Sequence, residues 1–566
     1  MFSHRLVQRW VRLVTFLTLM AMLGGVPGPL TARAAQDSGE KILRIHQLLY
    51  PETADPQKSS FTHEISFLVT NYEGLTRLDE NGQTSPAAAE DWTFNDDGTV
   101  LTFNLREGLK YSDGSPLTAD RFVYAVQRAC DPNTAGDYQY ILFDIVGCQE
   151  FASLYTEGDG ATPVSRDDAT AFEAARDAVG ITAPDDRTVE VTLNQPAPYF
   201  PSVAGLWVFF PAQRELIEAA GDAWWTDPAN QLGNGPFQVT EMEQDQLIAF
   251  EANENYWGGR PTLDGLELVY VPDPAVALEA YNAGDLDIMR PDPAQFPAIQ
   301  SDPELSKQFL SYAGTNTGLL SFNMQVAPFD DQKVREAFAY AFDRETWCTD
   351  VNNGACVPTL SWIPEGVPGY IETDAFAFDP EAATQALADS SYGGADGLPA
   401  IEYHYIADIP EERPRGEWIA GQYRDILGVE IELVPVEQAA WVRSINDPEN
   451  YPQMTLVGWF QDYPDPQNWL SILWACESFF ATPAGYCNPE FDALVEQADQ
   501  DLDPETRMPL YEQAHELLLA DAFAVVLANQ ANTFLVKPEV TGYKTTPSDG
   551  EWPGEWASPL TLDVTR

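Results

Sequence analysis

Alternating hydrophobic and polar residues predict strands in the first third of the chain. Leu101, Phe103 and Leu105 alternate with polar residues, and residues 189–193 show the same period of two. This spacing is typical of half-buried strands. The turn-forming run Asn95-Asp96-Asp97-Gly98 precedes the first of them, so we expect a β-hairpin with the segment around Trp92.

Helical patterns are clearest near the C-terminal end. Asn488-Pro489-Glu490 and Asp503-Pro504-Glu505 both place an N-cap residue before proline and an acid in the first turn. Each start leads into an apolar face, formed by Phe491, Leu494, Val495 and Ala498 and then by Tyr511, Ala514, Leu517 and Leu518. Apolar runs at 522–528 and 454–457 predict buried strands. Helices and strands recur throughout, so the predicted class is mixed α/β.

The first 34 residues have a different composition from the rest. They contain four arginines and no acidic residue, and the apolar run Leu13–Val26 precedes Ala32-Arg33-Ala34. This layout predicts a signal peptide over 1–34, with cleavage after Ala34 and export to the periplasm or cell surface. A membrane anchor is the alternative, although the apolar run is short for a span.

The charge balance argues against nucleic acid as a partner. The chain has 566 residues with 30 basic and 88 acidic side chains, a formal net charge of −58. Nucleic acid binding is not expected, because proteins bind phosphate backbones through lysine and arginine, and acidic side chains far outnumber basic ones in this chain. The length exceeds one ordinary hydrophobic core, so we expect two or three domains.

Six cysteines fall into three local couples. An even number of cysteines in an exported chain favours disulfides, and proximity favours one set among the 15 possible pairings: Cys130–Cys148, Cys348–Cys356 and Cys476–Cys487. A metal cluster is the less favoured alternative, because the chain has no Cys-x-x-Cys motif and no histidine beside a couple. We therefore expect no metal site.

Common catalytic and cofactor motifs are absent from the sequence. It contains no Walker A pattern, no Gly-x-Gly-x-x-Gly, no Gly-x-Ser-x-Gly and no His-Glu-x-x-His. We expect neither a cofactor nor enzymatic activity. Hydrolysis by a carboxylate pair stays open as an alternative, because the many acids offer numerous possible pairs.

An aromatic and acidic stretch follows the predicted strand at 454–457. Residues 458–470 read GWFQDYPDPQNWL and place Asp462 among aromatic rings. A carboxylate in such surroundings could bind a cation, since the rings lower the local dielectric. The alternative is a packed loop in which Asp462 caps backbone groups.

Ordered motifs along the chain carry a family resemblance. The chain resembles the peptide/nickel-type substrate-binding proteins of ABC importers, especially the oligopeptide-binding branch, over nearly all of the sequence after residue 34. The motifs are Tyr72-Glu73-Gly74-Leu75, Asp91-Trp92, residues 101–106, Tyr111-Ser112-Asp113-Gly114, residues 117–120, Cys130-Asp131-Pro132, residues 234–237, residues 255–259, residues 283–287 and Pro328-Phe329-Asp330-Asp331 with Val334-Arg335.

The resemblance implies a two-lobed periplasmic-binding-protein fold with a hinge and an extra subdomain inserted in the first lobe. Carried onto this chain, the first lobe comprises residues 35–72, 213–314 and 531–566. The inserted subdomain comprises 73–212, and the second lobe 315–530. A ligand is expected between the hinged lobes.

The resemblance also implies ligand-binding residues. Asp462 matches the acid that pairs with a peptide amino terminus, and Gly458 and Phe460 match positions whose backbone groups pair with the peptide main chain. Trp459 lies between them. Asn323 and Trp441 fall in stretches that line the family's binding cleft.

The resemblance is weakest where relatives hold the peptide carboxylate. Basic residues of the second lobe can serve there, but this chain has Asn352 and Val457 at two such places. Arg413 is the substitute that we select, and the alternatives are Arg415, Arg443 and His404.

The expected function is extracytoplasmic capture of an oligopeptide and its delivery to the transmembrane subunits of an ABC permease, by a monomer. One alternative keeps the transport role with another ligand, namely a metal chelate, haem or an oligosaccharide. A secreted hydrolase is the alternative from a different class.

Overall fold

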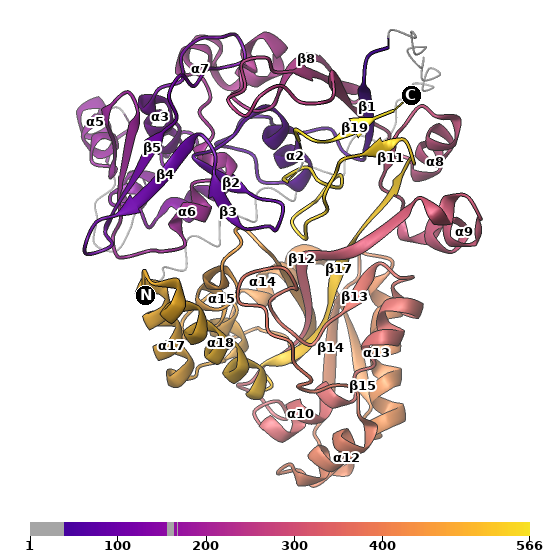
Figure 1. Ribbon diagram of the computed structural model, residues 1–566. Coiled ribbons are helices and arrows are strands. Elements are labelled where there is room, and N and C mark those ends of the chain that lie inside the picture. The colour runs from indigo at the N-terminus through magenta and orange to yellow at the C-terminus, as the bar shows by residue number, and fades with distance from the viewer. Residues whose placement is uncertain (1–38, 156–163, 167, 558, 566) are drawn as a thin grey trace. The chain divides into compact units, whose positions relative to one another are not determined.

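The computed structural model describes residues 39–155, 164–166, 168–557 and 559–565 (Figure 1). The predicted signal peptide lies outside them. Residue contacts divide the chain into two compact units. The middle unit contains 313–499 and 503–531, and the flanking unit contains the described residues up to 312, residues 500–502 and those from 532 on. The three-part division expected from the resemblance stays a prediction.

The middle unit is built on a mixed sheet with the strand order β15-β14-β16-β12-β17, and β13 pairs with β17. Strands β14, β15 and β16 run parallel to one another, whereas β12 and β16 are antiparallel. The strands are β12 (Phe309–Phe322), β13 (Cys356–Pro358), β14 (Ile401–Ile406), β15 (Ile431–Val436), β16 (Met454–Phe460) and β17 (Ala524–Val536). Strands β12 and β17 contain two of the passages of the chain between the units, at 312–313 and 531–532.

Helices cover both faces of this sheet (Figure 1). Successive strand residues point to opposite faces, so Leu320 joins a core with α10, α12 and α13, while Leu319 joins another with α15, α17 and α18. The helices are α10 (Gln332–Tyr340), α11 (Arg344–Thr346), α12 (Pro380–Asp389), α13 (Glu412–Leu427), α14 (Gln438–Ile445), α15 (Ser471–Trp474), α16 (Ala481–Ala484), α17 (Pro489–Gln500) and α18 (Pro504–Ala520).

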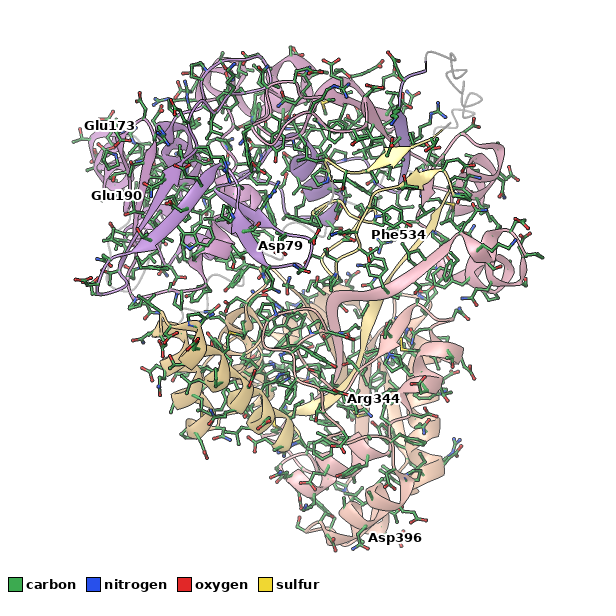
Figure 2. The ribbon with its side chains drawn as sticks, in the orientation of Figure 1. Asp79, Glu173, Glu190, Arg344, Asp396 and Phe534 are labelled. Carbon is green, nitrogen blue, oxygen red and sulfur yellow. A yellow bond between two sulfur atoms is a disulfide. The ribbon has the colours of Figure 1, made fainter. Side chains whose placement is uncertain are left out.

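A buried arginine ties helix α11 to strand β17. Arg344, labelled in Figure 2, donates hydrogen bonds to the carbonyl oxygens of Val526 (2.6 Å), Phe342 (3.2 Å) and Phe376 (3.1 Å). Burial lowers the pKa of Arg344 to about 10. The guanidinium thus satisfies carbonyl groups buried inside the middle unit.

The flanking unit holds a sheet with the order β11-β1-β10-β9-β8, and the C-terminal end of β17 pairs with β11. A separate four-stranded antiparallel sheet has the order β4-β5-β7-β6 and packs against α3. The strands are β1 (Ile42–Gln47), β2 (Thr76–Leu78), β3 (Thr84–Pro86), β4 (Ala89–Phe94), β5 (Val100–Leu105), β6 (Ile181–Asp185), β7 (Thr188–Thr192), β8 (Phe237–Glu243), β9 (Leu247–Ala252), β10 (Gly265–Tyr270), β11 (Ile288–Met289), β18 (Val540–Thr541) and β19 (Asp563–Val564).

The α-helices of the flanking unit are mostly short. They are α2 (Thr62–Asn71), α3 (Ala119–Ala129), α4 (Cys148–Ala152), α5 (Ala169–Asp177), α6 (Phe200–Val203), α7 (Arg214–Ala220), α8 (Pro274–Ala283) and α9 (Phe296–Ser301). No helix in the described part of the chain combines the length and the apolar character that a membrane span requires.

Several local predictions are confirmed. Strands β4 and β5 form the expected hairpin, and Gly98 at its turn has a φ of 74°. Helices α17 and α18 begin at Pro489 and Pro504. The six cysteines form the pairs Cys130–Cys148, Cys348–Cys356 and Cys476–Cys487.

The predicted bounds of two strands were wrong. The strand expected at 522–528 is Ala524–Val536, and the strand expected at 454–457 continues to Phe460 as β16. The second error matters for the site, because Gly458, Trp459 and Phe460 belong to the strand and not to a following loop.

Candidate functional site

The candidate site begins at one edge of strand β16. On the β12 side, the Gln461 N–H donates to the Thr315 carbonyl (2.9 Å) and the Asn323 N–H donates to the Gln453 carbonyl (3.0 Å). Residues alternate in an antiparallel ladder, so the odd-numbered residues from 453 to 461 direct their backbone groups toward β12. Gly458 and Phe460 therefore direct their N–H and C=O groups away from it.

The opposite edge of β16 is paired over only part of its length. Strand β14 pairs with β16 at Tyr403↔Met454 and His404↔Thr455. Within the described part of the chain, no strand pairing continues on this side through residues 458–460. We call residues 458–460 the open edge of β16. Its backbone donors and acceptors suit a ligand that adds a strand.

Position 458 requires glycine because strands β16 and β12 approach each other closely there. Gly458 lies opposite Gly318 of β12. A Cβ atom at position 458 would lie 3.0 Å from the Thr317 carbonyl oxygen, which is tighter than ordinary side-chain contacts. A larger residue would press β16 away from β12 and move the open edge.

Trp459 and Phe460 point to opposite faces of the sheet. Trp459 is half-buried against the core formed with α15, α17 and α18. Phe460 is 60% exposed. Of these two side chains, only Trp459 is held in a fixed position by packing.

Asn468 holds Asp462 beside Trp459. The side-chain oxygen of Asn468 accepts hydrogen bonds from the Asp462 backbone N–H (2.9 Å) and from Trp459 Nε1 (3.1 Å). Its amide nitrogen donates to Asp462 Oδ2 (3.1 Å). Asn468 is fully buried, whereas Asp462 is half-buried. The amide therefore fixes a carboxylate at the end of the open edge of β16.

A buried ion pair anchors the loop that carries Asp462. Asp465 and Arg507 form a bidentate pair at 2.8 and 2.6 Å, and each residue is 6% exposed. Burial alone would lower the pKa of Arg507, but the Asp465 carboxylate outweighs it and raises that pKa. Trp362 Nε1 donates to the Trp469 carbonyl (2.7 Å), so the loop is tied to the core at a second point.

The chain matches the family of bacterial extracellular solute-binding proteins, family 5, over residues 83–480. It belongs to this family. The dipeptide-binding protein DppE of Bacillus subtilis is 30% identical over 510 residues, 86% of each chain. The heme-binding protein A of Haemophilus influenzae is 29% identical over 481 residues, 82% of each chain.

A solved structure supports the same fold. The periplasmic murein tripeptide binding protein MppA, in its unliganded open form, has a TM-score of 0.79 at 24% identity and covers 93% of this chain and 97% of its own. The architecture is thus the two-lobed α/β fold of periplasmic binding proteins, as the family resemblance implied.

Motif residues of this family 5 protein build its flanking unit. Glu73 is buried and accepts hydrogen bonds from Tyr256 (2.6 Å) and from Trp257. The Arg106 guanidinium stacks over the Trp257 ring at 3.7 Å and donates to the Ala87 carbonyl. Burial raises the pKa of Glu73, and Arg77 opposes that shift. These contacts show that the motif residues Glu73, Arg106 and Trp257 pack against one another inside the flanking unit.

Two of the predicted contacts in this family 5 protein have internal partners. Asn323 is 5% exposed; it donates to the Tyr451 carbonyl (3.0 Å) and accepts from the Gln325 N–H (3.0 Å). Trp441 on α14 donates from Nε1 to Thr455 Oγ1 (2.9 Å), which places it beside β16. Their contact with a ligand stays a prediction.

The basic candidates lie on other elements of the middle unit. Arg413 on α13 pairs with Glu417 at 2.9 Å, with 71% of its side chain exposed. Arg415 pairs with Glu412 (2.8 Å) and donates to Asn352 Oδ1 (2.8 Å). His404 lies 3.1 Å from Glu402, and Arg443 is exposed. The described contacts do not join any of them to Asp462, and a role toward a ligand carboxylate stays a prediction.

One group within the described residues has the spacing of metal ligands, namely Cys476, Cys487 and Asp492. The two sulfurs are joined to each other in a disulfide, so they do not offer thiolates to an ion.

Asn468 is the site residue that sequence reasoning missed. It lies six positions after Asp462, and no local pattern distinguishes it from the neighbouring polar residues. Asn468 is fully buried and makes three hydrogen bonds only in the folded arrangement of β16 and the loop after it.

Proposed function

We propose that this protein captures oligopeptides outside the cytoplasmic membrane and delivers them to the transmembrane subunits of an ABC importer. It acts without catalysing a reaction and as a monomer, after export by the segment 1–34. The names of relatives such as the dipeptide-binding protein DppE support a peptide ligand.

One observation carries the proposal: the open edge of β16 ends at a carboxylate that Asn468 holds in place. Strand-like hydrogen bonds to a peptide main chain do not depend on its side chains, so they give affinity for many sequences. The Asp462 carboxylate then fixes the register by pairing with the peptide ammonium group. A half-buried position strengthens that attraction relative to water.

Titration calorimetry with trialanine and with N-acetyl-trialanine tests the proposal. The wild type should bind the free amine about 30- to several thousand-fold more tightly, because a charge buried without its partner is costly. Asp462→Asn should lose most of that preference. Asp396→Asn is a matched control, because Asp396 is exposed on the loop between α12 and β14 (Figure 2).

Haem and maltotriose serve as competing ligands in the same assay. The name of the heme-binding protein A keeps haem in the comparison. Binding of haem or maltotriose without binding of either peptide would overturn the proposal. Equal affinity of the wild type for both peptides would overturn the role of Asp462.

A further inference from the structure

An exposed aromatic ring lies on the loop between α15 and α16. Phe479 is 51% exposed. Its backbone N–H donates to the Ile472 carbonyl (3.2 Å), and the next N–H, of Phe480, donates to the Leu473 carbonyl (3.0 Å). The disulfide Cys476–Cys487 closes the loop. The backbone of Phe479 is thus fixed by hydrogen bonds to α15, while half of the side chain faces solvent.

Phe479 and its neighbour pack against Trp459. The centroids of the Phe479 and Phe480 rings both lie 6.0 Å from that of Trp459, and the two phenylalanine rings lie 5.1 Å apart. Phe480 is 6% exposed and packs on Trp474 at 5.6 Å. The rings therefore continue the core of the middle unit outward, and Phe479 is their solvent-facing end.

Trp459 connects this ring to the carboxylate of the site. Its Nε1 donates to Asn468 Oδ1, and the same Asn468 holds the Asp462 backbone and side chain. The indole thus has Asp462 near its Nε1 and Phe479 packed against its ring. Asp462 and Phe479 are therefore linked through the same indole, Asp462 by way of Asn468 and Phe479 by ring packing.

We propose that Phe479 forms the apolar wall of the subsite for the first side chain of a bound peptide, so that the protein prefers peptides beginning with an apolar or aromatic residue. This inference rests on the proposed function. The first side chain and the ammonium group leave the same Cα atom, about 1.5 Å from the nitrogen. An ammonium group at Asp462 therefore brings the first side chain, and not a later one, next to Phe479. An acidic first residue meets the negative charge of Asp462 and is disfavoured.

The test compares four tripeptides by titration calorimetry: Leu-Ala-Ala, Ala-Ala-Leu, Glu-Ala-Ala and Ala-Ala-Ala. The wild type should bind Leu-Ala-Ala about 5- to 50-fold more tightly than Ala-Ala-Ala, which corresponds to burial of most of one leucine side chain. Ala-Ala-Leu should gain much less, and Glu-Ala-Ala should bind most weakly.

Phe479→Ala should remove the advantage of Leu-Ala-Ala and change the affinity for Ala-Ala-Ala by less than about threefold, because only the wall of the subsite is lost. Phe479→Leu should restore part of the advantage. Phe378→Ala is the matched control, since Phe378 is a 44% exposed phenylalanine elsewhere in the middle unit.

The outcomes separate the two proposals. If Phe479→Ala keeps the preference for Leu-Ala-Ala, or if the wild type lacks it while still preferring free amines over N-acetylated peptides, the subsite inference is wrong and the proposed function stands. If none of the peptides binds, both are wrong.

Discussion

Asn468 forms hydrogen bonds with both the backbone and the side chain of Asp462: it accepts from the Asp462 N–H at 2.9 Å and donates to the carboxylate at 3.1 Å. A carboxylate held in this way has little rotational freedom left to lose when a cation arrives. Preorganisation of this kind increases affinity because the ordering is complete before binding.

Replacing Asn468 by alanine should therefore weaken binding without removing the charge of Asp462. We expect the affinity for trialanine to fall about 5- to 100-fold, because two N–H donors lose their acceptor and the carboxylate becomes mobile. Calorimetry measures the effect. Asn450→Ala, at an exposed asparagine of the same unit, should leave the affinity unchanged. Unchanged binding by a folded Asn468→Ala protein would contradict the role assigned to Asn468.

The buried pair Asp465–Arg507 should dominate the stability of the loop. Arg507→Met leaves a buried carboxylate unpaired and should lower the free energy of unfolding by about 3–5 kcal/mol, as measured in urea. Arg413→Met removes an arginine from an exposed pair with Glu417 and should cost less than about 1 kcal/mol.

A double replacement separates pairing from packing at the same place. Asp465→Asn combined with Arg507→Met should cost less than the sum of the two single replacements, because no unpaired buried charge remains. Additive losses would mean that the two residues stabilise the protein independently of each other.

Local elements could be predicted because their signals are local. The Asn95–Gly98 turn lies beside its own strands, and Asn488 and Asp503 cap the helices that they precede. The end of β16 could not be predicted, because Gly458–Phe460 owe their strand conformation to pairing with Gly318 and Asn316, about 140 residues earlier.

The site was predictable only in part for the same reason. Asp462 stood out as an acid among aromatic residues, and the family resemblance gave it a role. The partners that hold its loop lie elsewhere in the sequence: Arg507 is 42 positions from Asp465, and Trp362 is 107 positions from Trp469. A role for Phe479 could not be predicted from the sequence, because it depends on the exposure of the ring and its contact with Trp459 in the folded protein.

A half-buried carboxyl behind the loop should make stability depend on pH. Asp499 accepts hydrogen bonds from Ser471 (2.7 Å) and Tyr511. Burial raises the pKa of Asp499 to about 7, although these hydrogen bonds and the charge of Arg507 oppose the rise. In the unfolded chain the carboxyl titrates near about 4. Between these pH values the folded state therefore binds more protons than the unfolded state. The contribution of the Asp499 carboxyl to the free energy of unfolding is lost as the pH rises from about 4 through 7.

Asp499→Asn should remove that contribution while keeping an oxygen that accepts from Ser471 and Tyr511. Between pH 5 and pH 8, we expect the wild type to lose about 1–3 kcal/mol more free energy of unfolding than the variant. Urea titrations at the two pH values measure the difference. Because His515, with a pKa lowered to about 4 by burial, changes stability in the opposite direction, only the comparison of the two proteins isolates Asp499. Parallel pH profiles would show that Asp499 is ionised in the folded protein.

The disulfide Cys476–Cys487 should stabilise the fold and keep Phe479 in place. Replacing both cysteines by alanine opens a loop of 11 positions, which should cost roughly 2–3 kcal/mol by the chain-entropy model. Removing Cys348–Cys356, with a separation of 8, should cost a similar amount, yet it changes a loop that carries neither Phe479 nor Asp462. The two variants are thus matched in stability but not in position. Only the Cys476/Cys487 variant should reduce the preference for Leu-Ala-Ala over Ala-Ala-Ala, and both should keep the preference for a free amine. An equal loss of the leucine preference in both variants would trace it to general loosening of the protein, not to the loop that presents Phe479.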